Sequence, residues 1–380
     1  MTLDNKIKVI VVDDTVIYRK ILKDVLSEID NVEVTGTAPN GDLALRKISL
    51  DPPDLVLLDV EMPVMDGLQT LEEIKKRFPQ IGVIMVSGVN ERQAAITVEA
   101  LNKGALDFIP KPQGNDIQSN INSLKQSLSP IIALFTTRKT LSSFKSGKES
   151  KTFVDTSVVE KIKTTAFKPT TDSSITKTLL KTKIPNKFEI LVVGVSTGGP
   201  NALAKFIPFL PDDLGVPILV VQHMPPMFTK SLASHLNTKS KLAVLEANDN
   251  DLIDKNKVYI APGGKHMIIK KEDNINKLSI IDTPPVNSCK PSVDVLFDSV
   301  SKQYTGNVLS VIMTGMGSDG LNGVKSLKNI SSYTLTQSEN TCVVYGMPRA
   351  IDEAGLTDES IDLDNLANRV VSIIKNGVKK

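Results

Sequence analysis

The chain has 380 residues, 41% of them hydrophobic, which is enough to build two domains of ordinary size. Its 45 basic and 43 acidic residues leave a net charge of +2, so the charge balance predicts neither a nucleic-acid partner nor insertion into a membrane. No segment approaches the roughly 20 apolar residues of a membrane span, and the N-terminus lacks the pattern of a signal peptide. Cys289 and Cys342 lack metal-ligand spacing, and two domains of this size need no disulfide, so we expect a cytoplasmic protein.

The first part of the chain, from Lys6 to about Pro112, alternates short apolar runs with helical patterns. The runs are rich in β-branched residues and almost wholly apolar, which is typical of strands buried on both faces of a parallel sheet. We therefore expect a doubly wound α/β fold of five βα units. The predicted strands are IKVIVV, VEVTGTA, LVLL, GVIMVS and DFIPKP, and the predicted helices span 18–26, 43–48, 67–78 and 94–101.

Ser, Thr and Lys dominate the next stretch, from about Thr136 to Lys183, and its apolar residues are scattered. This composition is typical of a linker with at most transient helix. Its lysines could form a docking patch for an anionic surface, but we favour a solvated tether. We expect a first domain at 1–135, a linker at 136–185 and a second domain at 186–380.

A second alternating series begins at Phe188 and predicts a Rossmann-like, mainly parallel α/β sheet. Its middle third holds consecutive strands without intervening helices, which indicates a β-hairpin insertion. The predicted strands are FEILVVGVS, VPILVVQH, KLAVLEA, KVYIAPG, HMIIK, KLSIID, VLSVIMTG and 333–337, and the predicted helices follow Pro200 and lie near 228–236, 293–300 and 321–327.

Polar residues follow four of the five predicted strands in the first domain, at the edge where open α/β sheets form their crevice. They are Asp13 and Asp14, Asp59, Ser87, and Lys111. Clustered carboxylates suit Mg²⁺, and a carboxylate such as Asp59 can accept a phosphoryl group whose charge the metal and a lysine neutralise. Each residue alone could be a helix cap or a turn residue. Together they indicate a phosphoacceptor site.

This domain resembles the receiver domain of response regulators in VVDD, LLDVEMPVMDG, MVSG and DFIPKP. The resemblance implies phosphorylation of Asp59 and binding of Mg²⁺ by Asp13, Asp14 and Asp59. It also implies that a histidine kinase supplies the phosphoryl group. The switch positions that it implies are Ser87, Lys111 and Phe108.

The second domain opens with a glycine-rich turn, GVSTGG, between a predicted strand and a helix. The pattern fits G-x-S-x-G, in which Ser196 would be an exposed nucleophile near a helix N-terminus. Such turns also bind phosphate or dinucleotides, so the motif alone leaves both alternatives open. A nucleophile requires a base, and His223 follows a strand that ends at the same predicted edge. His235 falls inside a predicted helix, where a structural role is expected, and His266 follows an APGGK loop that could reach the site.

Asp319 lies in TGMGSDG after another apolar strand, where it could orient the imidazole as the acid of a serine hydrolase triad. An Asp before Gly is also a common turn residue. The chain order Ser, His, Asp differs from the order in α/β-hydrolases, so the G-x-S-x-G match does not imply that fold.

The segments GVSTGGP, QHMPPMFT, YIAPGGKHM, PPVN, PSVDVLF, MTGMGSDG and CVVYGMPRAI resemble the catalytic domain of chemotaxis protein-glutamate methylesterases across nearly all of 188–380. The resemblance implies the nucleophile Ser196, the base His223 and the acid Asp319, with the N–H of Met316 in the oxyanion hole and Thr197 beside the nucleophile. It implies demethylation of glutamate esters on methyl-accepting chemotaxis receptors, deamidation of receptor glutamines, and no cofactor in the catalytic domain.

Two departures from this family's pattern stand out. Ser288, Cys289 and Lys290 replace a more basic, histidine-containing run, and Met227 stands where glycine is common. Two other functions remain open from the residues: a serine hydrolase of small metabolites, and a nucleotide-binding module that uses the GVSTGG turn. No basic recognition helix follows the first domain, so DNA binding is not expected.

Overall fold

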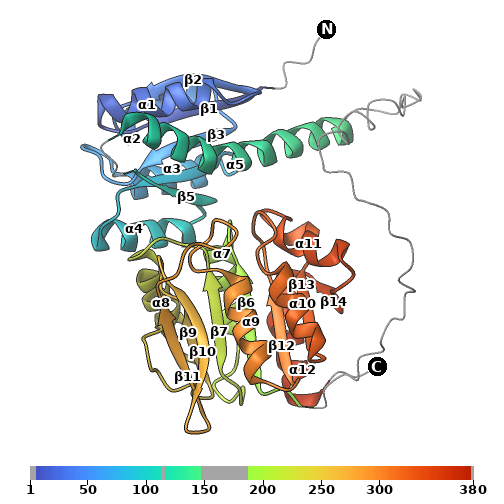
Figure 1. Cartoon of the computed structure of the whole chain (residues 1–380). Helices are drawn as coiled ribbons and strands as arrows, with labels where there is room; N and C mark the ends of the chain where they lie inside the picture. Colours follow the sequence, from blue (N-terminus) through green and yellow to red (C-terminus); the bar gives the residue numbers. More distant parts are fainter. Residues whose placement is uncertain (1–5, 113–115, 147–186, 378–380) are drawn as a thin grey trace.

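The computed structural model describes residues 6–112, 116–146 and 187–377 and shows two α/β units packed against each other (Figure 1). Most of the predicted linker, 147–185, lies outside the described residues. No helix in the described ranges is both long enough and apolar enough to cross a membrane.

The N-terminal unit is a parallel sheet of five strands in the order β2-β1-β3-β4-β5. One core cluster joins the sheet to α2, α3 and α4, and a second joins the opposite face to α1 and α5. The predicted doubly wound (βα)5 fold is therefore confirmed. Its elements are β1 (Ile7–Val12), α1 (Val16–Ser27), β2 (Val32–Ala38), α2 (Gly41–Leu50), β3 (Leu55–Asp59), α3 (Gly67–Arg77), β4 (Gly82–Ser87), α4 (Glu91–Asn102), β5 (Asp107–Pro110) and α5 (Ile117–Ser146).

Helix α5 continues to Ser146, past residue 135, where we predicted the first domain to end and the linker to begin. The first part of the segment that we predicted as linker, 136–146, is therefore helical. Ser, Thr and Lys are compatible with a helix once it has been nucleated, and the apolar residues of the preceding turns, including Leu128 and Ile132, are buried against the first sheet.

The C-terminal unit contains seven parallel strands in the order β14-β13-β12-β6-β7-β9-β8. The separate antiparallel pair β10–β11 is the predicted hairpin insertion, so this fold class is also confirmed. The strands are β6 (Ile190–Val195), β7 (Ile218–Gln222), β8 (Ala243–Glu246), β9 (Lys257–Ile260), β10 (His266–Glu272), β11 (Ile275–Ile281), β12 (Val308–Ile312), β13 (Tyr333–Gln337) and β14 (Glu359–Ile361). The helices are α7 (Gly199–Phe206), α8 (Phe228–Lys239), α9 (Val293–Gln303), α10 (Leu321–Asn329), α11 (Met347–Glu353) and α12 (Leu363–Asn376), with 3-10 turns at Ile207–Phe209 and Glu339–Thr341.

Strand β6 lies at the point where the strand order reverses, between β7 on one side and β12 on the other. Ligands of open α/β sheets bind in the crevice outside the carboxyl ends of strands at such a point. The residues that follow β6, β7 and β12 therefore meet at one edge of the sheet.

The two units share a packed interface at this edge (Figure 1). Helix α4 packs against α7 and α8, and Ala94 and Val98 of α4 belong to the same hydrophobic cluster as the second core. The Phe108 ring at the end of the first sheet stacks on the Phe228 ring of α8, with centroids 4.4 Å apart. The interface is therefore built from buried apolar side chains rather than from surface charges alone.

Candidate active site

Ser196 occupies the sharp turn between β6 and α7. Gly198 adopts the left-handed backbone conformation, with φ of 74°, which glycine allows at little cost. A Cβ at Gly199 would lie 1.9 Å from Oε1 of Gln222, so any other residue there would displace the Gln222 side chain. The Gln222 side chain donates a 3.0 Å hydrogen bond to the Ser196 carbonyl. The turn is therefore fixed by its neighbours, and the GVSTGG sequence supplies the two glycines that it needs.

His223 follows β7, the neighbour of β6, and its backbone N–H donates to the carbonyl of Val195 at 3.2 Å. Its ring nitrogen Nε2 lies 2.8 Å from Oδ2 of Asp319. Because Nε2 faces Asp319, a proton from a nucleophile would have to be accepted at Nδ1, which lies 3.5 Å from the Cys289 sulfur.

Asp319 follows β12 and lies at the N-terminus of α9, where helix dipoles favour negative charge. Only 2% of the residue is exposed, yet five groups donate to its carboxylate when the imidazole is counted. The others are the side chains of Asn287 and Ser292 and the backbone N–H groups of Val293 and Asp294. Burial would raise the pKa of Asp319, but hydrogen bonds from His223, Asn287 and Val293 outweigh burial and lower the pKa to about 2. The carboxylate is ionised near neutral pH.

The pKa of His223 is set by the same contact. Burial alone would lower the pKa, but hydrogen bonds to Asp319 and Cys289 raise it to about 9. The contact between Asp319 and His223 thus stabilises the protonated imidazole, which is the state that a general base reaches during the reaction.

Ser196, Thr197, His223 and Met316 line one cavity of about 210 Å³. The loop that carries Asp319 passes close to the nucleophile, since a Cβ at Gly315 would lie 2.8 Å from the Ser196 Cβ. The structure therefore brings together the alcohol, the imidazole and the carboxylate that the sequence analysis selected from three distant segments. It also places Met316 and Thr197 at the same cavity.

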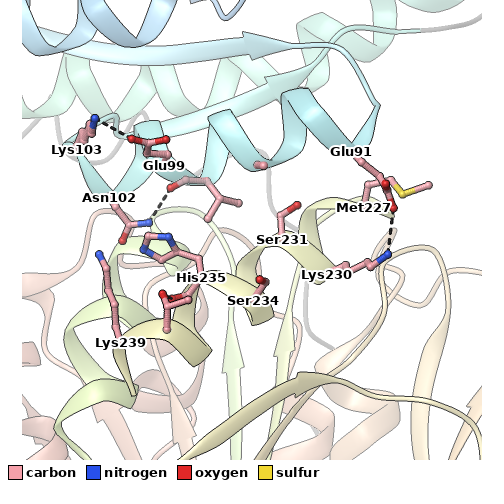
Figure 2. A pocket seen from close by; sticks show the side chains of 13 residues that line it. Glu91, Glu99, Asn102, Lys103, Met227, Lys230, Ser231, Ser234, His235 and Lys239 are labelled. Atoms are coloured by element: carbon pink, nitrogen blue, oxygen red, sulfur yellow. Dashed lines mark hydrogen bonds and ion pairs between the residues drawn. The ribbon is translucent and has the colours of Figure 1, made fainter. Parts of the chain in front are cut away.

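The remaining histidines lie elsewhere. His266 is fully buried, with its nitrogens bonded to the Pro284 carbonyl and the Ser292 N–H, so it supports the loops behind the site. His235 is on α8 and lines a separate cavity of about 650 Å³ between α8 and α4, together with Glu99 and Lys239 (Figure 2). Neither reaches Ser196.

The predicted phosphoacceptor residues also meet at one edge, that of the first sheet. Asp13, Asp14 and Asp59 place carboxylate oxygens within 4.8 Å of one another. The Lys111 ammonium lies 2.7 Å from Asp13 and 2.8 Å from Asp59. Burial raises the pKa of Asp59 to about 6, Lys111 opposes this rise, and the neighbouring Asp13 carboxylate adds to it. Three acids with a single lysine form a hard, oxygen-rich set whose chemistry fits Mg²⁺.

The two other predicted switch residues differ in their surroundings. Ser87 is fully buried at the end of β4, where its hydroxyl donates to the Gly88 carbonyl and accepts from Thr97. Phe108 is turned towards the second unit through its stack on Phe228. Ser87 therefore links the phosphoacceptor edge to α4, and Phe108 links the first sheet to α8.

Several residues of the site have no role predicted from the sequence. Gln222, Asn287 and Ser292 hold the nucleophile turn and Asp319, and Cys289 places its sulfur 3.5 Å from Nδ1 of His223. Asp107 of the first unit also lines the cavity and accepts a hydrogen bond from the Gly198 N–H. The segments PPVN and PSVD were visible in the sequence, but only the fold shows that they surround Asp319.

Two family models match the chain: the CheB methylesterase model at residues 191–370 and the response regulator receiver domain model at residues 9–122. Full-length relatives named protein-glutamate methylesterase/protein-glutamine glutaminase include one from Desulfotalea psychrophila, 43% identical over 97% of this chain and 99% of the relative. Another, from Bacillus subtilis, is 41% identical over the same shares.

Two solved structures from Thermotoga maritima resemble the separate units. The CheB methylesterase catalytic domain is 37% identical, covers 49% of this chain and 99% of its own, and has a TM-score of 0.48. The response regulator domain of CheB is 37% identical, covers 35% of this chain and 97% of its own, and has a TM-score of 0.32.

Proposed function

The chain belongs to the family of protein-glutamate methylesterases/protein-glutamine glutaminases that carry a receiver domain, and from this membership we propose the roles of its residues. Ser196 is the nucleophile, His223 the general base and Asp319 the acid that orients the imidazole. The observation that carries this assignment is the 2.8 Å contact between His223 and Asp319 at the cavity that Ser196 lines.

The reaction follows from the placement of the protons. Nε2 of His223 faces Asp319, so Nδ1 takes the proton of the Ser196 hydroxyl. At the same time the Ser196 oxygen attacks the carbonyl carbon of a glutamate methyl ester. The negative oxygen that forms is stabilised by the N–H of Met316, with Thr197 beside the nucleophile. Nδ1 returns the proton to the departing methoxide, which leaves as methanol, and water then releases the acyl group from Ser196. A glutamine side chain would lose ammonia by the same steps.

The substrates in this proposal are glutamates and glutamines of methyl-accepting chemotaxis receptors, and the phosphoryl donor is a chemotaxis histidine kinase. Under this proposal the enzyme works in the cytoplasm, where receptor side chains and the kinase meet it. The receiver supplies the input at Asp59, and Mg²⁺ held by Asp13, Asp14 and Asp59 would neutralise charge on the transferred phosphoryl group. Lys111, already paired with two of these acids, adds a second positive charge there. The catalytic unit is proposed to need no cofactor.

Control of the esterase is proposed to come from the receiver, which covers the Ser196 cavity. The strand β5 contributes Asp107–Pro110 to the cavity wall, and α5 contributes Ser127 and Ile131. Asp107 accepts a hydrogen bond from the nucleophile turn, and Asn201 of α7 donates to the Ala105 carbonyl at 2.9 Å. A receptor must displace this cover before one of its side chains can reach Ser196. Phosphorylation of Asp59 would shift the population towards an open arrangement.

The test of this control measures methanol release from methylated receptor membranes with and without a small phosphodonor. The intact chain should accelerate when the donor is added, whereas Asp59→Asn should keep its resting rate and fail to respond. Equal rates of the intact chain with and without the donor, under conditions where phosphorylation of Asp59 is verified by mass spectrometry, would refute receiver control.

A further inference from the structure

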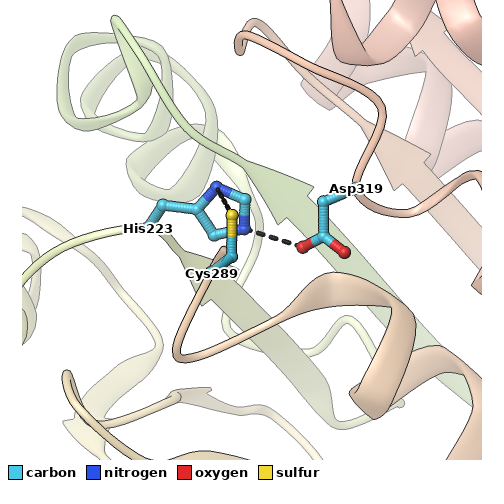
Figure 3. Close-up of side chains that lie close together, drawn as sticks. All are labelled: His223, Cys289 and Asp319. Carbon is cyan, nitrogen blue, oxygen red and sulfur yellow. Dashed lines mark hydrogen bonds and ion pairs between the residues drawn. The ribbon is translucent and has the colours of Figure 1, made fainter. Parts of the chain in front are cut away.

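Cys289 places a thiol beside the catalytic imidazole, and its sulfur, a ring nitrogen of His223 and a carboxylate oxygen of Asp319 lie within 4.8 Å of one another (Figure 3). Its Sγ lies 3.5 Å from Nδ1 of His223, while Nε2 of the same ring is held 2.8 Å from Asp319. The thiol is half-buried, so small solutes in the crevice can reach it. The mechanism proposed above makes no use of this thiol.

The position of Cys289 is fixed by its backbone. The Cys289 N–H donates to the Val286 carbonyl at 2.8 Å, and the Val286 N–H donates back to the Cys289 carbonyl at 3.1 Å. The two residues between them, Asn287 and Ser288, adopt left-handed conformations with φ of 52° and 60°. This pattern is a tight two-residue hairpin turn, which aims the following side chain in a defined direction. The sulfur is therefore positioned before any ligand arrives.

The spacing of sulfur and nitrogen matches one edge of a tetrahedral metal site. Zn²⁺ binds thiolate at about 2.3 Å and imidazole at about 2.05 Å, so two such ligands at the tetrahedral angle are about 3.6 Å apart. The observed separation of Sγ and Nδ1 is 3.5 Å. We propose that Cys289 and His223 form a two-residue site for a thiophilic divalent cation, Zn²⁺ being the type ion, and that the bound ion reversibly inhibits the esterase.

Asp319 completes this site as an outer partner rather than as a third ligand. His223, Asn287 and the α9 backbone already occupy its oxygens with hydrogen bonds. A metal-binding histidine commonly donates its other ring N–H to a carboxylate, which fixes the ring and increases its basicity as a ligand. The contact between Nε2 and Asp319 is an arrangement of this kind. The remaining coordination positions of the ion would face the cavity, where water or the Ser196 hydroxyl can fill them.

The ligand types separate this site from the acid cluster of the receiver. A thiolate and an imidazole favour Zn²⁺ over Mg²⁺, whereas Asp13, Asp14 and Asp59 provide only carboxylate oxygens. One chain therefore carries two metal-binding clusters of opposite preference. Excess Mg²⁺ should occupy the acids and leave the thiol–imidazole pair to Zn²⁺.

Inhibition follows because the ion would occupy Nδ1, the atom that accepts the Ser196 proton. This consequence rests on the catalytic role proposed above for His223, whereas binding of the ion does not. The two can be separated with Ser196→Ala, which removes the nucleophile and leaves both ligands in place.

The binding experiment titrates Zn²⁺ into the full chain in excess Mg²⁺, followed by calorimetry. Co²⁺ serves as a second probe, since thiolate coordination gives a sulfur-to-metal charge-transfer band in the near ultraviolet. Ser196→Ala should bind one ion and show the band. Adding Cys289→Ala to it should weaken binding by at least about tenfold and remove the band, as loss of a ligand requires. Cys342→Ala is the matched control, because it removes the other thiol, which is buried and donates to the Gln337 carbonyl.

The inhibition experiment measures methanol release, with each protein compared with its own rate in the presence of a chelator. Zn²⁺ should inhibit wild type and Cys342→Ala alike, a chelator should restore the rate, and Cys289→Ala should require at least about ten times more Zn²⁺ for the same fractional loss. Equal binding and equal inhibition with and without Cys289 would overturn the proposal. Binding and a charge-transfer band without any inhibition would uphold the metal site and instead contradict the role of His223.

Discussion

Replacing Asp319 with asparagine removes one negative charge from the catalytic pair and keeps the size of the side chain. Among the contacts that raise the pKa of His223, the hydrogen bond to Asp319 is the largest, and burial of the ring acts to lower the pKa. In the variant an amide N–H can face Nε2, which would place the ring proton on Nδ1. A ring with that tautomer cannot accept the Ser196 proton.

The expected size of the effect can be worked from the pKa of His223. Its rise from 6.5 to about 9 corresponds to a net of roughly 3 kcal/mol in favour of the imidazolium, which remains after burial has opposed the contacts with Asp319 and Cys289. Loss of the charge alone therefore slows the reaction by up to about 10²-fold, and loss of the correct tautomer extends the effect towards about 10⁴-fold. We expect kcat to fall between these limits.

The assay is methanol release by the phosphorylated full chain, combined with urea unfolding of each variant. Asp319→Asn also disturbs hydrogen bonds to α9, which costs about 1–3 kcal/mol of stability. Asp294→Asn is the matched control, because Asp294 is a buried carboxylate in the first turn of α9 that accepts hydrogen bonds from the N–H groups of Gly320 and Gly323. It should lose comparable stability and far less activity. A folded Asp319→Asn protein with a rate within tenfold of wild type would show that the Asp319 charge is not needed to orient and stabilise His223.

Three further predictions concern pH, the interface and the nucleophile turn. The acid limb of the pH profile of kcat/KM should have an apparent pKa above 6.5, up to about 9. The reason is that Asp319 and Cys289 favour protonated His223, whereas catalysis needs the neutral ring. A limb at or below 6.5 would contradict this prediction. Phe108→Ala should raise the methanol-release rate of the unphosphorylated chain by up to about tenfold. The stack on Phe228 contributes about 0.5–1.5 kcal/mol to the closed arrangement, and the variant loses it. An unchanged resting rate would count against a receiver that covers the Ser196 cavity. Gly199→Ala should lower the free energy of unfolding, measured in urea, by about 1–3 kcal/mol and should reduce activity. The new methyl group displaces the Gln222 side chain from the Ser196 carbonyl. A variant as stable as wild type would show that the turn is less crowded than the structure indicates.

The sequence predicts the two sheets and the edge at which each group of polar residues lies, for a simple physical reason. All strands of a parallel sheet end at the same edge, so a polar residue that directly follows an apolar run is placed there without knowledge of the strand order. Ser196, His223 and Asp59 follow their strands in this way. Asp319 lies seven residues beyond Ile312, and only its glycine-rich loop suggested that it returns to the edge.

Other features depend on contacts that no local pattern encodes. The adjacency of β12 and β6 joins segments more than a hundred residues apart, and Cys289 reaches His223 through a turn whose left-handed residues, Asn287 and Ser288, are not glycines. The short strand β14 has three residues and lies at the edge of the sheet, so its sequence carries little pattern. The cover over the cavity requires the arrangement of both units, which neither half of the sequence specifies by itself.

Acylation of the Ser196 hydroxyl oxygen is the step on which the proposed mechanism rests. Methyl-labelled receptor membranes are incubated with phosphorylated wild type and with Ser196→Ala, and labelled methanol is counted. The wild type should release methanol, and Ser196→Ala should release no more than membranes alone. Release at the wild-type rate from Ser196→Ala would show that Ser196 is not the nucleophile.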